Sequence, residues 1–62
     1  MNFHFGKETS TGKEQLTVTR TPSDTDETLE DFAKTLKGSV RMIHNTDANG
    51  KVRLDEIIVT LD

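Results

Sequence analysis

Two stretches in the first third of the chain alternate between apolar and polar residues. In residues 2–7 the alternation is built on two phenylalanines, and in residues 14–21 it is built on Leu16 and Val18. A period of two is typical of a β-strand that buries one face. Residues 8–13, ETSTGK, are rich in Ser, Thr and Gly and are typical of a turn. The pattern therefore predicts an N-terminal β-hairpin.

The segment between Pro22 and Gly38 predicts one amphipathic helix. Its apolar residues recur at the i, i+3, i+4, i+7 spacing that places a single stripe against a core: Leu29, Phe32, Ala33 and Leu36. We expect Ser23 or Asp24 to be the N-cap and the helix to extend to about Lys37. Gly38 then provides the left-handed residue that ends the helix.

Alternation returns after the helix, around Val40 and Met42, and again from Val52 onward. Between these stretches lies DANG at 47–50, which is typical of a tight turn because Asp bonds the backbone two residues on and Gly accepts a left-handed conformation. The elements have the order β-β-α-β-β. The sequence thus predicts an α+β fold, a ββαββ four-stranded sheet packed on one face by a single helix, in one small domain spanning 1–62.

The predicted last strand changes phase along its length. Its apolar residues occupy even positions at Val52 and Leu54 and odd positions at Ile57 and Val59. A slip of one residue inverts the faces of a strand. Either a β-bulge lies near residues 55–56, or both faces of this strand are covered and a second chain supplies the extra cover.

Ile43 and Ile58 are expected to lie outside the core of the single chain. They would form either an apolar patch for a modest dimer interface or two ordinary exposed isoleucines. The expected core consists of ten apolar residues from the predicted strands and helix: Phe3, Phe5, Leu16, Val18, Leu29, Phe32, Leu36, Val40, Ile57 and Val59.

In size, in element order and in the Asp-Ala turn that opens its second hairpin, the chain resembles the immunoglobulin-binding domains of proteins G and L, and β-grasp folds more broadly. The resemblance implies a fold alone. No binding motif of those domains aligns with residues of this sequence, so it implies no function.

Composition limits the class of protein further. The chain has 62 residues, 31% of them hydrophobic, with no cysteine, so we expect a small core without disulfides and a stability of only a few kcal/mol. The longest apolar run is three residues, and the N-terminus lacks a signal-peptide pattern. We therefore expect a cytoplasmic protein with no membrane contact. Its net charge of −3 argues against bulk binding to nucleic acid.

Residues 45–56, NTDANGKVRLDE, also match the twelve-residue calcium loop of an EF-hand. Oxygen-bearing side chains occupy its positions 1, 3, 5 and 12: Asn45, Asp47, Asn49 and Glu56. Only two of these ligands are charged, and the β-branched residues that follow favour a strand over the helix that an EF-hand requires. We therefore favour the turn and expect no metal and no cofactor, with weak Ca²⁺ binding at this loop as an alternative.

Enzymatic chemistry is not indicated. The two histidines, His4 and His44, belong to different predicted hairpins and share no metal-ligand spacing. The serines fall at turns or helix ends without a His–carboxylate partner, and the glycines never cluster into a phosphate-binding loop. We expect a protein that is not an enzyme.

The function that we expect is protein binding, as a small module, regulator or inhibitor, with self-association into a homodimer as one form of that binding. The predicted contact surface is either an exposed sheet edge or the acidic face of the helix: Glu27, Glu30 and Asp31. Such a helix can also imitate the backbone of a nucleic acid. The alternative is nucleic-acid binding on the open face of the sheet through Gln15, Thr17, Thr19, Arg41 and Arg53, which is less favoured because single-strand platforms use exposed aromatic residues.

Overall fold

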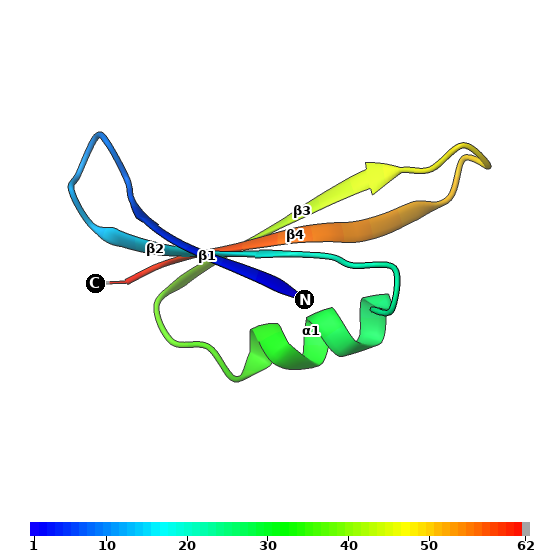
Figure 1. The fold of residues 1–62 in the computed structure, drawn as a ribbon, viewed down its shortest axis with the longest axis horizontal. Helices are drawn as coiled ribbons and strands as arrows, with labels where there is room; N and C mark the ends of the chain where they lie inside the picture. Colours follow the sequence, from blue (N-terminus) through cyan, green and yellow to red (C-terminus); the bar gives the residue numbers. More distant parts are fainter. Residues whose placement is uncertain (62) are drawn as a thin grey trace.

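The computed structural model describes residues 1–61 and confirms the predicted fold class (Figure 1). Four strands form one sheet and a single helix lies on one of its faces, while the other face is uncovered by any element of the described chain. The elements are β1 (Asn2–Lys7), β2 (Glu14–Thr19), α1 (Asp26–Lys34), β3 (Ser39–Thr46) and β4 (Val52–Thr60).

The strand order in the sheet is β1-β2-β4-β3, and every neighbouring pair is antiparallel. β4 and β2 are therefore central, and β1 and β3 are the edges. The resemblance to the immunoglobulin-binding domains holds for the order of elements along the chain. It does not extend to the sheet, because β1 and β4 are separated by β2 and do not form the central parallel pair of a β-grasp sheet.

Helix α1 begins later than the sequence predicts. Its N-cap is Thr25, which forms a capping box with Thr28: the Thr28 N–H donates to Thr25 Oγ1 at 3.2 Å, and the Thr25 N–H donates to Thr28 Oγ1 at 2.9 Å. The prediction of Ser23 or Asp24 as the cap was wrong. Asp24 is unavailable because its carboxylate already accepts the Thr21 N–H at 2.9 Å and pairs with the amino group of Met1 at 2.9 Å.

The helix also ends earlier than predicted, at Lys34. The Thr35 hydroxyl donates to the Phe32 carbonyl at 2.7 Å, and the Leu36 N–H donates to the Ala33 carbonyl at 3.2 Å, so the last turn tightens and stops. Gly38 follows with a φ of 106° and begins the approach to β3. The left-handed glycine is present, but it lies beyond the helix end and not at its cap.

The phase change of the last strand is a β-bulge, as one of the two sequence alternatives predicts. Ile43 pairs with Glu56 while the next residue of β3, His44, pairs with Leu54, which leaves Asp55 as the extra residue of β4. Because of this bulge Leu54 and Ile57 both face the helix, and both are fully buried. No second chain is needed to account for the pattern.

The core lies between α1 and the two central strands. It contains Val18, Leu29, Ala33, Leu54, Ile57 and Val59, with Met1, Leu16, Phe32 and Leu36 packed around it. Three residues of the predicted core are exposed instead: Phe3 by 55%, Phe5 by 71% and Val40 by 37%. All three lie on edge strands. A helix about 10 Å wide covers about two strands spaced about 4.8 Å apart, so the edges remain open.

Arg20 and Asp26 supply hydrogen-bond partners for β4 where β2 ends. Beyond Thr19, no strand pairs with β4 on its β2 side, so the backbone groups of Leu54 have no strand partner there. The Arg20 guanidinium donates to the Leu54 carbonyl at 3.1 Å and to Asp26 Oδ1, and the Leu54 N–H donates to Asp26 Oδ1 at 3.2 Å. The hydrogen bond from Arg20, and a weaker one from the Leu54 N–H, lower the pKa of the Asp26 carboxyl.

Asp24 makes folding stability sensitive to acid. Its hydrogen bond from the Met1 amino group, with the Thr21 N–H, lowers the pKa of the carboxyl from 3.8 to about 2. Because the pKa is lower in the folded chain, this stabilisation is complete above about pH 4 and is lost as the pH falls toward 2. We expect Asp24→Asn to lower the Tm at pH 7 and to flatten the fall of Tm between about pH 4 and 2, measured by circular dichroism.

Asp31→Asn is the matched control for this experiment, because Asp31 is exposed on α1. Its melting profile is expected to follow that of the unaltered chain at every pH. An Asp24→Asn profile with the same acid slope as the unaltered chain would show that the contacts of Asp24 do not contribute to acid sensitivity.

Candidate functional site

Strand β1 presents a free backbone edge. The backbone groups of successive residues in a strand point to opposite sides. The Glu8 N–H donates to the Lys13 carbonyl at 2.8 Å, so the even-numbered residues of β1 point toward β2. The odd-numbered residues Phe3, Phe5 and Lys7 therefore direct both their N–H and C=O groups outward, where the described part of the chain places no other strand.

The contacts of β2 on its other side support this assignment. The Leu61 N–H donates to the Glu14 carbonyl at 2.8 Å, which places the even-numbered backbone groups of β2 toward β4 and its odd-numbered groups toward β1. In the β1–β2 register, odd residues of β2 pair with even residues of β1, for example Thr17 with His4. Both neighbours of β2 thus give the same alternation.

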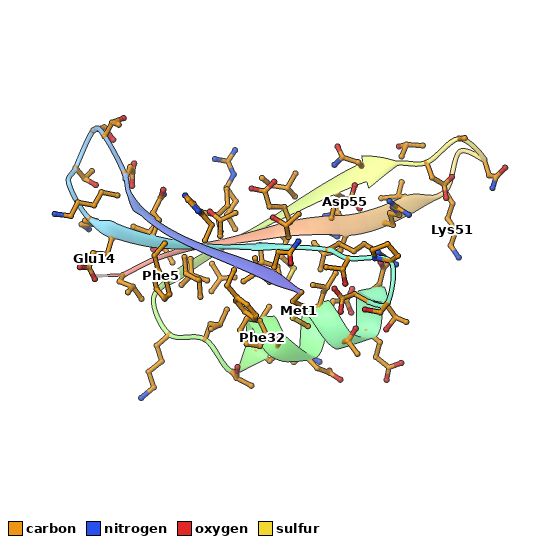
Figure 2. All side chains as sticks on the ribbon, viewed as in Figure 1. Met1, Phe5, Glu14, Phe32, Lys51 and Asp55 are labelled. Carbon is orange, nitrogen blue, oxygen red and sulfur yellow. The ribbon has the colours of Figure 1, made fainter. Side chains whose placement is uncertain are left out.

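The side chains of Phe3 and Phe5 are also more than half exposed. Phe5 has the largest exposed fraction among the large apolar residues of the described chain. Phe3 packs edge-on against Phe32 of α1, with ring centroids 5.6 Å apart, so both β1 phenyl groups lie on the helix side of the sheet (Figure 2). The same two residues therefore offer free backbone hydrogen-bonding groups and free apolar surface.

The three acidic residues predicted as a contact surface do share the outer side of α1. Glu27, Glu30 and Asp31 are all exposed. Asp31 lies 3.8 Å from the Lys34 ammonium, and at this exposure the pair contributes little. The other carboxylates of this segment, Asp24 and Asp26, have structural roles, so the acidic helix face consists of these three residues.

The residues of the nucleic-acid alternative share the uncovered face of the sheet but do not form one basic patch. Across the strands Thr17 pairs with Ile58, and Ile58 pairs with Arg41. Arg53 is held by Asp55, with Nε 3.0 Å from Oδ1. Ile43 and Ile58, which the sequence predicts to lie outside the core, are half-buried on this face. The predicted contacts, which also include Gln15 and Thr19, are thus separated by these two isoleucines and by the acidic side chains of Asp55 and Glu56.

This face has no Phe, Tyr or Trp side chain among the described residues, because Phe3 and Phe5 point to the helix side and Phe32 belongs to α1. A face without phenyl, phenol or indole groups, and with Asp55 and Glu56 among its arginines, is a poor platform for single-stranded nucleic acid.

Residues 45–56 form a hairpin and not a calcium loop. Their flanks are strands β3 and β4, whereas an EF-hand requires helices. The Asp47 carboxylate accepts the Lys51 and Asn49 N–H groups, each at 2.9 Å, which lowers the pKa of this carboxyl. Glu56 instead pairs with Ile43 beyond the bulge. The alternative with Asn45, Asp47, Asn49 and Glu56 as calcium ligands therefore lacks the two flanking helices that it requires. The predicted turn is confirmed.

Residues 1–61 contain no group of three or more His, Asp or Glu side chains that could together hold a metal ion. Within the same range, no helix has the length and apolar character needed to cross a membrane. No known protein family, curated protein or solved structure matches this chain. What the chain binds must therefore be inferred from its own surface.

Proposed function

We propose that this chain is a small non-enzymatic protein-binding domain that takes an extended segment of another polypeptide along β1. The observation that carries the proposal is the coincidence at Phe3 and Phe5 of outward backbone groups and exposed side chains. Free edges are the surfaces at which sheets accept a further strand. Main-chain hydrogen bonds give such binding its affinity, and alternate side chains give it specificity.

The chemistry of the edge favours particular segments. An added strand would place every second side chain on the helix side of the sheet, beside the two phenyl groups, so apolar residues are expected at alternate positions. The acidic helix face lies on that same side, and the chain has a net charge of −3, which disfavours an acidic segment. The expected partner segment is extended, alternately apolar, and neutral or basic.

A displayed library of random heptapeptides selected on the immobilised protein tests this proposal. Selected peptides are expected to show apolar residues at alternate positions. In amide hydrogen exchange followed by NMR, an enriched synthetic peptide should protect Phe3, Phe5 and Lys7, whose N–H groups point outward. His4 and Gly6 should change little, because their N–H groups already pair with β2.

Two double variants locate the site. Phe3→Thr with Phe5→Thr keeps strand propensity but removes the phenyl groups, and it is expected to weaken peptide binding at least tenfold. Val40→Thr with Met42→Thr makes the matching change on the other edge strand and should leave affinity within twofold. Unchanged affinity in the first pair, or protection centred on β3, would contradict the proposal.

The acidic helix face is the second candidate, supported by the exposure of its three carboxylates on one side of α1. Replacing Glu27, Glu30 and Asp31 together by Ala separates the two candidates. If β1 is the site, peptide binding survives this change. If the helix face is the site, binding is abolished while the circular dichroism spectrum is retained.

A further inference from the structure

We infer that the strand that β1 accepts is β1 of a second copy of this chain, in an antiparallel pairing centred on His4. This inference rests on the proposed function and names the occupant of the same edge. A two-fold axis through the pairing makes the contact self-complementary, so each copy donates and accepts the same bonds. The result is one eight-stranded sheet with both helices on the same face.

The positions of the outward backbone groups limit the possible registers. A hydrogen-bonded antiparallel pair requires outward-pointing residues on both strands, which are Phe3, Phe5 and Lys7 in each copy. Centring on His4 pairs residues 2–6 of the two copies and places each Phe3 opposite Phe5 of the other copy. Centring on Phe5 pairs residues 3–7, which is equally long, but places each Phe3 opposite Lys7, a phenyl group beside an ammonium. The apolar pairing therefore favours the register centred on His4.

This register places four phenyl groups together. Phe3 and Phe5 of both copies meet on the helix side, where each ring is exposed in the single chain. The contact covers on the order of 200–300 Å² of phenyl surface on each copy. Such an area belongs to small, transient interfaces, so the expected dimer is concentration-dependent and exchanges rapidly.

The residues of β1 suit self-pairing better than those of the other edge. Natural edge strands avoid pairing by carrying charged side chains. The one charged side chain of β1 is Lys7 at its end, and residues 2–6, which pair in this register, carry none. β3 carries Arg41 near its middle, and its helix-side residues Val40 and Met42 are 37% and 40% exposed, less than either phenylalanine. Pairing of β1 of one copy with β3 of the next would be a heterologous contact between two different edges. It would give an open polymer and not a closed dimer.

His4 lies at the centre of this pairing, on the uncovered face of the sheet. In this register the two His4 side chains form the closest cross-strand pair on the uncovered face. The β2 residues around His4 on that face, Gln15, Thr17 and Thr19, are uncharged, and the second copy adds only its Asn2, His4 and Gly6. The centres of the two strands therefore meet on this face without an Asp, Glu, Lys or Arg side chain.

Cysteine cross-linking tests the register, because the natural sequence contains no cysteine. The Cα atoms of a non-hydrogen-bonded antiparallel pair lie about 4.5 Å apart, within the range of a disulfide. We expect His4→Cys to form a covalent dimer on mild oxidation. Asn2→Cys, on the same face, is the matched control: its two copies lie about four residues apart along the strands, roughly 13 Å, and should not cross-link. Equal cross-linking of both variants would overturn the register.

Sedimentation equilibrium across micromolar to millimolar concentrations tests the dimer itself. The unaltered chain should show a monomer–dimer equilibrium within this range. Phe3→Thr with Phe5→Thr should be monomeric, whereas Val40→Thr with Met42→Thr should dimerise normally.

Failure of this inference differs from failure of the proposed function. A chain that is monomeric at all concentrations, yet whose Phe3 and Phe5 amides are protected by a selected peptide, overturns the self-pairing alone. Absence of both dimer and peptide protection overturns both. Polymers that are lost in either double variant would show pairing of β1 with β3 and would also overturn the closed dimer.

Discussion

Replacing Leu54 by alanine is expected to leave most of the protein unfolded at room temperature. Leu54 is fully buried beneath α1, and removing a buried leucine side chain to Ala costs about 2–5 kcal/mol. A core of this size rarely supplies more than about 3–5 kcal/mol of net stability, so the loss is comparable to the whole. Circular dichroism and the amide dispersion of an NMR spectrum measure the result directly.

Val52→Ala is the control for Leu54→Ala, because Val52 lies on the same strand and is 58% exposed. Its effect should stay within about 0.5 kcal/mol, as is usual at surface positions. If the two variants melted at the same temperature, the bulge would not be carrying Leu54 into the core. The position of the phase change in β4 would then have to be reassigned.

The second large effect is expected at Gly38. An alanine Cβ there would lie 2.6 Å from the backbone carbonyl oxygen of Thr60, and the φ of 106° is unfavourable for any side chain. The carbonyl belongs to β4 and cannot rotate away without breaking the start of the β3–β4 ladder, where Ser39 pairs with Thr60. We expect Gly38→Ala to cost more than about 2 kcal/mol, combining backbone strain with the clash.

Alanine variants of Gly12 and Gly50 separate the cost of backbone strain from the cost of the clash with Thr60. Their φ values are 72° and 81°, but no atom lies within 4 Å of the position of an added Cβ. Gly12→Ala and Gly50→Ala should therefore lose only about 1–2 kcal/mol each, from the left-handed backbone alone. Urea unfolding of the three variants gives the comparison, and equal losses at all three positions would exclude the contact with Thr60.

Much of the fold follows from periodicity. The two hairpins, the helix and their order are predicted correctly because residues 14–19 and 39–46 keep one phase and the helical stripe has a single period. The bulge is also visible in the sequence, since an inverted phase between Leu54 and Ile57 requires either a bulge or a strand covered on both faces. These features are local, and each depends only on which neighbours along the chain are apolar.

The burial of the edge strands could not be obtained in this way. Alternation shows that Phe3 and Phe5 share a side, but whether that side is covered depends on the width of the helix and on the strand order. The sequence predicts neither that β2 and β4 are central nor that α1 has only nine residues. The three acids of the helix face lie together because their spacing fixes their side of the helix. The sequence also predicts contact at an exposed sheet edge, but it cannot show that β1 is an edge, because the strand order is a property of the whole sheet.

The bulge at Asp55 also divides the second hairpin into two mechanical parts. On the C-terminal side of the bulge, Ile57 and Val59 hold the β3–β4 ladder against the core. On the side nearer the turn, Leu54 is the last fully buried side chain of β4. The pairs beyond Leu54, closed by the Asp47–Gly50 turn, have little buried surface to hold them together. This tip can open and reclose while the rest of the sheet stays folded, so its amides should exchange with solvent through a separate, less costly opening.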